Sequence, residues 1–151
     1  MLHALSDYGY ADTAYKMATA KDFPGWGWWV ENGHSTLVEN WRLDSPRDNS
    51  DNHIMFGDIS AWFYKALGGI QPDADQPGFR HIILKPSFPK GLDSFECSHE
   101  SPYGTIRTSW AKKGRKIEFC ATIPCNCTAS VHFPGGRTEE LESGTYRLTV
   151  K

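Results

Sequence analysis

The sequence predicts an α+β protein in two parts, with helices over residues 1–69 and an antiparallel β-sandwich over residues 70–151. Apolar residues recur at helical spacing in the first part, whereas short β-rich segments alternate with Gly and Pro in the second. The composition changes as well, since five of the six tryptophans precede residue 63 and all four cysteines follow residue 96. A length of 151 residues suits one ordinary domain or two small ones.

In the first part, residues 1–5 are predicted to end a preceding helix, and two further helices are predicted after them. Residues 11–20 contain mainly good or fair helix formers, with alanines at helical spacing. Residues 52–67 carry one continuous apolar stripe, which predicts a longer amphipathic helix. Asp51 or Asn52 can cap its start, and Gly68 and Gly69 supply the left-handed exit at its end.

The segment between these helices, residues 21–50, is predicted to be mostly irregular because Gly and Pro interrupt it repeatedly. The interrupting residues are Pro24, Gly25, Gly27, Gly33 and Pro46. Long irregular segments in compact domains usually carry function. We therefore expect the functional residues of the first part to lie here.

The second part is predicted to be all β. Residues 70–77 have the composition of a turn-rich linker, and short strands follow it at regular spacing. The predicted strands are residues 79–84, 94–99, 105–110, 116–123, 128–133 and 146–150. In residues 116–123 every second position is apolar, as in a strand with one buried face.

Several function classes are disfavoured by composition. A formal net charge of -2 argues against nucleic-acid binding through charge. No apolar run approaches the roughly 20 residues of a membrane span. Residues 1–20 lack the basic start and apolar stretch of a signal peptide, so the localisation of a longer parent protein stays open.

No cofactor or metal site is expected. The cysteines form no C-x-x-C pair and have no His at zinc-finger spacing. A disulfide between Cys97 and Cys120 is possible, but reduced thiols packed as small hydrophobic groups are expected. Asp73 and Asp75 share one loop, which is a weak signal for calcium. The four cysteines are Cys97, Cys120, Cys125 and Cys127.

The long loop holds residues suited to carbohydrate chemistry. Glu39 lies among aromatic and small residues, which shield its carboxylate partly from water and suit it to proton transfer. His53 can donate hydrogen bonds to a hydroxylated ligand. Four tryptophans are suited to wall a pocket: Trp26, Trp28, Trp29 and Trp41. Each residue also has a structural alternative, a cap or ion pair for Glu39, a cap for His53 and core packing for the tryptophans.

Three ordered blocks resemble the C-terminal end of bacterial α-L-rhamnosidases. Residues 23–27 (FPGWG) resemble the family pattern Y-P-x-W-G, and residues 33–39 (GHSTLVE) resemble G-x-T-T-L-W-E. Residues 50–57 (SDNHIMFG) resemble S-x-N-H-x-x-x-G. Val38 departs from the pattern, because the family usually has Trp at that position.

The resemblance implies an inverting glycoside hydrolase that cleaves terminal α-L-rhamnosyl bonds. Residues 1–69 then end an α/α six-hairpin toroid, and residues 70–151 form its trailing β-sandwich. Glu39 aligns with the general base, His53 with a histidine of the sugar pocket, and Trp41 and Trp26 would line the same cleft. The general acid lies upstream of this chain in the family.

The resemblance also implies partners. Rhamnose-containing glycosides are the expected substrates, and the rest of a parent catalytic domain is the expected protein partner. The chain alone is expected to be inactive. Two alternatives stay open: a β-sandwich that binds carbohydrate through Tyr103 and Trp110 or simply braces a glycosidase, and an oligomer in which apolar helix stripes pair between copies.

Overall fold

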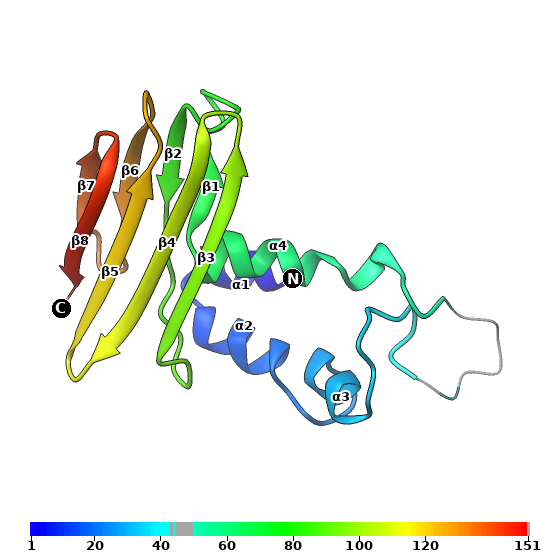
Figure 1. Cartoon of the computed structure of the whole chain (residues 1–151). Coiled ribbons are helices and arrows are strands. Elements are labelled where there is room, and N and C mark those ends of the chain that lie inside the picture. Colours follow the sequence, from blue (N-terminus) through cyan, green and yellow to red (C-terminus); the bar gives the residue numbers. More distant parts are fainter. Residues whose placement is uncertain (43, 45–49, 151) are drawn as a thin grey trace. The chain divides into compact units, whose positions relative to one another are not determined.

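A computed structural model describes residues 1–42, 44 and 50–150 (Figure 1). Pro46 and Lys151, which belong to the predicted irregular segment and the predicted sandwich, lie outside the described residues. The chain divides into two compact units, Met1–Trp62 and Phe63–Lys151. Helices come first and two sheets follow, so the predicted α+β class is confirmed.

The first unit consists of short helices. They are α1 (Leu2–Asp7), α2 (Ala11–Ala18), α3 (Trp26–Glu31), the 3-10 helix η1 (Ile54–Phe56) and α4 (Asp58–Trp62). Helices α1 and α2 pack against each other, and α1 also contacts α4. The indole N–H of the fully buried Trp62 donates to the hydroxyl of Ser6 at 2.8 Å, which ties the first and last helices of this unit together.

Helix α2 confirms the helix predicted for residues 11–20, but the prediction of a mostly irregular segment after it is wrong in part. Helix α3 forms there because Trp29 is buried, with 2% of its surface exposed. Gly27 permits this packing, since a Cβ at that position would lie 2.5 Å from the carbonyl oxygen of Ala20. Tertiary contacts therefore outweigh the weak helix propensity of the sequence.

The single helix predicted over residues 52–67 is divided into η1, α4 and the π-helix η2 (Phe63–Leu67). His53 caps the start, so the prediction of Asp51 or Asn52 as the cap is wrong. The end matches the prediction, because Gly69 has a left-handed backbone with φ +80.

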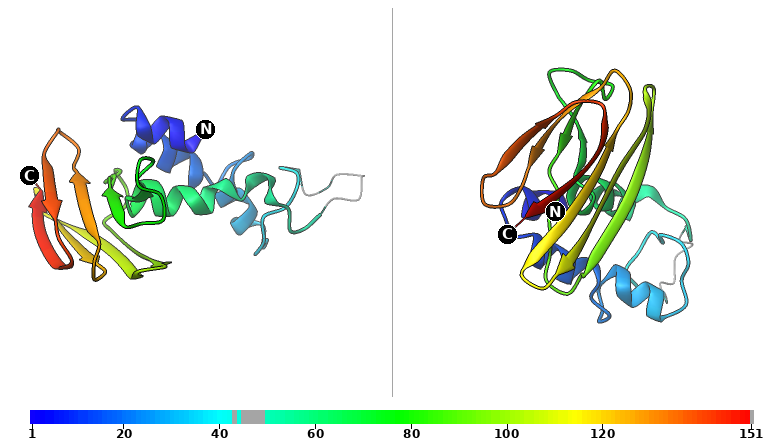
Figure 2. Two further views of the ribbon diagram at one scale, coloured as in Figure 1. Left: turned by 90° about the horizontal axis from the view of Figure 1, so that it is seen from above. Right: turned by 60° about the vertical axis from the view of Figure 1, so that its left-hand side comes forward.

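The second unit is a β-sandwich. Its strands are β1 (Ile70–Pro72), β2 (His81–Leu84), β3 (Ser94–Ser101), β4 (Gly104–Lys113), β5 (Lys116–Ile123), β6 (Thr128–His132), β7 (Thr138–Leu141) and β8 (Gly144–Val150). One sheet has the order β1-β2-β6-β7 and the other β3-β4-β5-β8. Figure 2 shows the two sheets as separate layers, and the second of them lies in front in Figure 1.

The sandwich differs from the prediction in three places. Strands β2 and β6 pair in parallel, with Ile82 opposite Ala129, whereas the other described pairs are antiparallel. Strand β1 occupies the start of the predicted linker, and β7 was not predicted at all. Strand β5 has the predicted bounds.

One continuous apolar core fills the space between the two sheets, with Ile82, Leu84, Ile106 and Phe119 fully buried at its centre. All four cysteines are free thiols. Burial raises the pKa of the Cys97 thiol above its ordinary value.

The sandwich binds the backbone at the end of η2. The indole N–H of Trp110 donates to the carbonyl of Leu67 at 2.8 Å, and the Thr108 hydroxyl donates to the carbonyl of Gly68 at 2.8 Å. Only 2% of the surface of Trp110 is exposed, which argues against the alternative in which this ring binds sugar at the surface. These bonds satisfy carbonyls that a helix end otherwise leaves without partners.

Within the described residues, every helix is too short or too polar to span a bilayer.

Candidate functional site

Two segments of the first unit run side by side and bring the predicted site residues into neighbouring positions. The backbone N–H of Glu39 donates to the carbonyl of Ser50 at 3.0 Å. The backbone N–H of His53 donates to the carbonyl of Leu37 at 2.7 Å. Glu39 and His53 are 14 positions apart in the chain, and this pairing places them on adjacent backbone segments.

The carboxylate of Glu39 is held in a defined orientation. Its Oε2 atom accepts a hydrogen bond from the backbone N–H of Ser50 at 2.9 Å, and the side chain is half-buried. Hydrogen bonds from backbone amides to carboxylates are stronger than those between neutral groups. The preceding residue, Val38, is buried with 4% of its surface exposed, so the carboxylate follows directly on a residue packed in the core.

His53 combines a structural role with an unoccupied donor. Its Nδ1 atom accepts a hydrogen bond from the backbone N–H of Met55 at 3.1 Å, which caps η1. The cap foreseen as the structural alternative is therefore present. Because Nδ1 acts as the acceptor, the neutral ring carries its proton on Nε2. The half-buried ring thus offers an N–H donor on the side away from the cap.

Trp26 and Trp41 belong to a cluster of four aromatic rings completed by Trp29 and Phe56. The rings of Trp29 and Trp41 stack at 4.5 Å, and Phe56 lies 4.3 Å from Trp41. Trp26 meets Trp41 edge to face at 5.1 Å. Two indole N–H groups bind backbone carbonyls within the cluster, Trp26 to Phe56 and Trp29 to Trp41.

One member of this cluster, Phe56, was not identified as a site residue from the sequence. Its ring contacts three tryptophan rings, and its backbone carbonyl accepts a hydrogen bond from the indole N–H of Trp26. Its position three residues after His53 is the only local signal of its proximity. The rings of Trp26 and Trp41 also stabilise the unit, since each aromatic pair contributes about 0.5–1.5 kcal/mol beyond its buried area.

Trp28 does not join the cluster, although it comes from the same helix. Its ring lies 5.2 Å from that of Phe23, at 82°. Together with Asn32, Arg42 and Asp44 these rings line a separate open pocket of about 500 Å³. The first unit therefore has an aromatic cluster on one face of α3 and a pocket on another.

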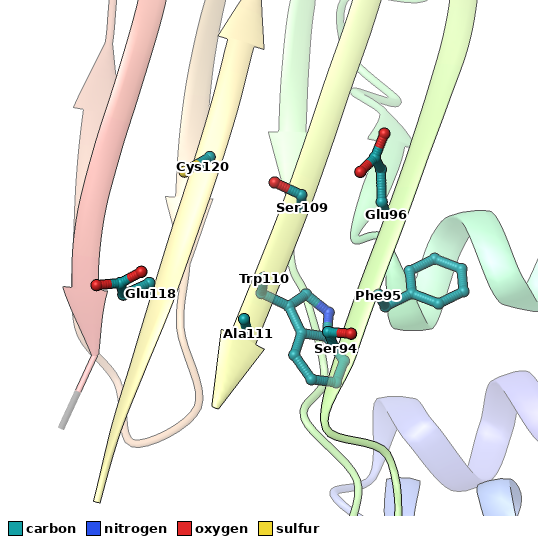
Figure 3. A pocket seen from close by; sticks show the side chains of 8 residues that line it. All are labelled: Ser94, Phe95, Glu96, Ser109, Trp110, Ala111, Glu118 and Cys120. Atoms are coloured by element: carbon teal, nitrogen blue, oxygen red, sulfur yellow. The ribbon is translucent and has the colours of Figure 1, made fainter. Parts of the chain in front are cut away.

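The sandwich carries a hollow of its own on the outer face of β3, β4 and β5 (Figure 3). Its volume is about 480 Å³, and small side chains form its middle: Ser109, Ala111 and Cys120. Glu96 and Glu118 stand on either side of these residues. Trp110 contributes almost no exposed surface here, so the hollow offers little aromatic area on which a sugar could stack.

Metal ligands are not gathered in the described part of the chain, where no group of three or more His, Cys, Asp or Glu is close enough to hold an ion. Asp73, one of the two loop carboxylates, accepts a hydrogen bond from the backbone N–H of Asp75 at 3.0 Å. This contact is that of an ordinary turn.

The helical unit and the β-sandwich that follows it match two adjacent family models, which together define the class as a 6-hairpin glycosidase domain followed by a C-terminal domain. Residues 1–67 match the family model of the bacterial alpha-L-rhamnosidase 6 hairpin glycosidase domain. Residues 69–147 match that of the bacterial alpha-L-rhamnosidase C-terminal domain. The chain belongs to the bacterial α-L-rhamnosidase family.

Individual relatives agree with this assignment. The chain is 33% identical over 140 residues to an alpha-L-rhamnosidase of Formosa agariphila, covering 91% of this chain and 15% of the relative. It is 27% identical over 149 residues to one of Streptomyces avermitilis, covering 94% and 14%. The chain therefore spans about 15% of the length of these curated relatives.

Two crystal structures are similar over nearly the whole chain. The Streptomyces avermitilis alpha-L-rhamnosidase complexed with L-rhamnose has a TM-score of 0.90 at 27% identity, covering 99% of this chain and 17% of that one. The alpha-L-rhamnosidase from Aspergillus terreus has a TM-score of 0.90 at 28% identity, covering 99% and 18%.

Proposed function

We propose that this chain is the C-terminal part of an inverting α-L-rhamnosidase and supplies its general base, Glu39. In this proposal residues 1–69 end the catalytic toroid and residues 70–151 form the trailing sandwich. The substrates are rhamnose-containing glycosides with a terminal α-L-rhamnosyl group. The observation that carries the proposal is the pairing of the Glu39 and His53 segments, which continue in the sequence into Trp41 and Phe56 of the aromatic cluster.

Glu39 acts on the water in this mechanism. With Oε2 bound to the Ser50 amide, Oε1 is the oxygen that takes a proton from the attacking water. The water adds to the anomeric carbon from the face opposite the leaving group, and a second carboxylic acid protonates the departing oxygen. In inverting enzymes the two carboxyl groups stand about 6.5–9.5 Å apart. The second one is supplied by the missing part of the enzyme.

His53 and the tryptophans bind the sugar in this proposal. The Nε2–H group of His53 donates to a sugar hydroxyl, since Nδ1 is already used by Met55. Trp26 and Trp41 form an apolar wall for the methyl-bearing face of a deoxy-sugar. Both side chains are half-buried, so part of each remains accessible while their contacts with Trp29 and Phe56 keep them rigid.

The base assignment is tested in a joined enzyme in which this chain replaces the corresponding C-terminal part of the Streptomyces avermitilis relative. Glu39→Gln removes the proton acceptor and keeps the size, so we expect kcat to fall about 10²–10⁴-fold. Glu31→Gln, an exposed glutamate bound to Lys21 at 2.6 Å, is the matched control and leaves kcat unchanged. Near-normal turnover of Glu39→Gln would end the assignment.

Inversion and the inactivity of the isolated chain need separate measurements. Proton NMR of the first product released from an α-rhamnoside by the joined enzyme is expected to show β-L-rhamnose before mutarotation. The α-anomer as first product would exclude inversion. The 151-residue chain alone is expected to release no sugar from the same substrate, because it lacks the general acid.

A structural role for the sandwich is the second candidate, and one observation favours it. Residues up to Leu67 match the hairpin glycosidase model, and the carbonyl of Leu67 accepts a hydrogen bond from the buried Trp110 of the sandwich. We infer that the sandwich braces the last helix of the catalytic domain. The Trp110→Phe experiment in the Discussion tests this inference.

A further inference from the structure

We propose that the pocket lined by Phe23, Trp28, Asn32, Arg42 and Asp44 is a second carbohydrate site, which binds a neutral pyranose unit apart from the Glu39 site. The pocket has a volume of about 500 Å³, within the range of small-molecule sites. The proposal does not depend on the catalytic role of Glu39.

Helix α3 separates this pocket from the aromatic cluster. Trp26 and Trp29 are three positions apart and share one face of the helix, on which they contact Phe56. Trp28 and the C-cap residue Asn32 are four positions apart and share another face. Because successive residues of a helix point about 100° apart, the two faces look in different directions.

Two aromatic rings give the pocket an apolar corner. Phe23 and Trp28 meet at 82° with their centres 5.2 Å apart, so they form two walls at nearly a right angle. Phe23 is 53% exposed, so part of its ring is accessible from the pocket. Such a corner fits a ligand that has an apolar face and a polar edge, as a pyranose ring has.

Polar groups face this corner from two segments. Nε and Nη2 of Arg42 donate to the two carboxylate oxygens of Asp44, each at 3.2 Å. Asn32 donates through Nδ2 to the carbonyl of Trp28 at 2.8 Å, which fixes the amide plane. The pocket therefore presents a guanidinium, a carboxylate and an amide in defined orientations, and these are groups that bind vicinal hydroxyls through paired hydrogen bonds.

Charge selects a neutral ligand. Arg42 and Asp44 cancel each other in net charge, so an anion would meet the carboxylate and a cation would meet the guanidinium. The hydrogen bond and the charge of Arg42 hold the pKa of the Asp44 carboxyl below its ordinary value, which keeps the pair ionised at neutral pH. A wholly apolar ligand would remove water from both charges without replacing their hydrogen bonds. A neutral, hydroxylated ring avoids both kinds of charge repulsion and can form hydrogen bonds with both charged groups.

Titration of the 151-residue chain with methyl α-L-rhamnoside and with methyl α-D-glucoside, followed by NMR of the indole N–H signals, tests the proposal. We expect a saturable shift of the Trp28 signal with at least one of the two sugars. Trp28→Ala removes the indole that reports binding, so this variant is followed through the side-chain amide signals of Asn32. It should bind about tenfold more weakly, because one of the two apolar walls is lost. Arg42→Gln and Asp44→Asn should each weaken binding several-fold. Since these two side chains are 71% and 75% exposed, we expect both variants to keep the fold. They therefore still test the proposal if the Trp28→Ala variant does not fold.

Two controls separate this site from the catalytic proposal. Val30→Ala, an exposed change on the same helix outside the pocket, and Glu39→Gln should both bind the sugars like the parent chain. The proposal is overturned if neither sugar shifts the Trp28 signal, or if Glu39→Gln abolishes the shift and Arg42→Gln does not. In the joined enzyme the pocket variants Arg42→Gln and Asp44→Asn should leave kcat for a simple aryl rhamnoside unchanged. Failure of the base assignment would show only in the kcat of Glu39→Gln.

Discussion

The two units of this chain differ in how far each one buries its own apolar residues. Among the described residues, seven large hydrophobic side chains are exposed in the first unit, whereas only Tyr64 and Tyr103 are exposed in the second. The seven are Met1, Tyr8, Tyr10, Phe23, Val30, Ile54 and Met55. The sandwich encloses one continuous core between its two sheets. The residues proposed for catalysis thus lie in the unit that leaves more of its large apolar side chains exposed, and the sandwich has the more complete core.

The largest effect is expected from separating the two units. Residues 63–151 as a fragment should fold and melt cooperatively, because the core between the sheets is complete. Residues 1–62 should lack cooperative melting, because short helices depend on tertiary packing and this unit leaves several large apolar side chains exposed. Circular dichroism melts and dispersion of amide NMR signals measure both. A cooperative melt of residues 1–62 alone would remove the contrast between the units.

The second largest effect is expected from Trp110→Phe, which should lower the stability of the sandwich. The change leaves the buried carbonyl of Leu67 without its donor and removes part of a buried ring. We expect the free energy of unfolding to fall by about 2–3 kcal/mol in denaturant titrations. Tyr103→Phe, at an exposed position, should change it by less than about 0.5 kcal/mol. Equal effects of the two changes would contradict the bracing role.

Gly27→Ala should destabilise the helical unit more selectively. The added methyl group would lie 2.5 Å from the carbonyl oxygen of Ala20, so α3 must shift. We expect the free energy of unfolding of this unit in the full chain to fall by about 1–2 kcal/mol. Denaturant titrations followed by near-ultraviolet circular dichroism of the clustered tryptophans measure this change. Val30→Ala on the exposed side of α3 is the control and should have little effect. Loss of the tryptophan signal in the control would show that α3 is sensitive to any change.

The smallest effect concerns acid titration of Asp44. Arg42 lowers the pKa of this carboxyl below its ordinary value of 3.8 through a hydrogen bond and its charge. Because the pKa is lowered in the folded state, the pair stabilises the fold at pH values above the ordinary pKa. This contribution is lost as the pH falls through the lowered pKa of the folded state. In a pH titration followed by carbon-13 NMR, the Asp44 carboxyl should have a lower midpoint in the parent chain than in the Arg42→Gln variant. Identical midpoints would show that the pair is absent in solution.

The sequence predicted the class and many elements because local patterns determine them. Helix α2 and strand β5 follow directly from the spacing of their apolar residues. Strand β7 has the sequence TEEL and β1 includes Pro72, so neither shows the alternation that predicts a strand. The parallel pairing of β2 with β6 leaves no local signal, since alternation is the same in both directions.

The sequence named the members of the candidate site but not their arrangement in space. Glu39 and His53 were found through the family resemblance, but their proximity depends on backbone bonds between segments far apart in the sequence. The division of the tryptophans depends on α3, which the propensities of its residues do not predict. Trp28 was therefore grouped with Trp26, Trp29 and Trp41, although it faces Phe23.

The parallel pairing of β2 with β6 has a consequence for the order of folding. His81 and Thr128 are 47 positions apart, and the whole hairpin series β3, β4 and β5 lies between them. Closing so long a loop costs more chain entropy than forming adjacent hairpins. The hairpins should therefore form early, and the slow step of folding should be the arrival of β6 beside β2.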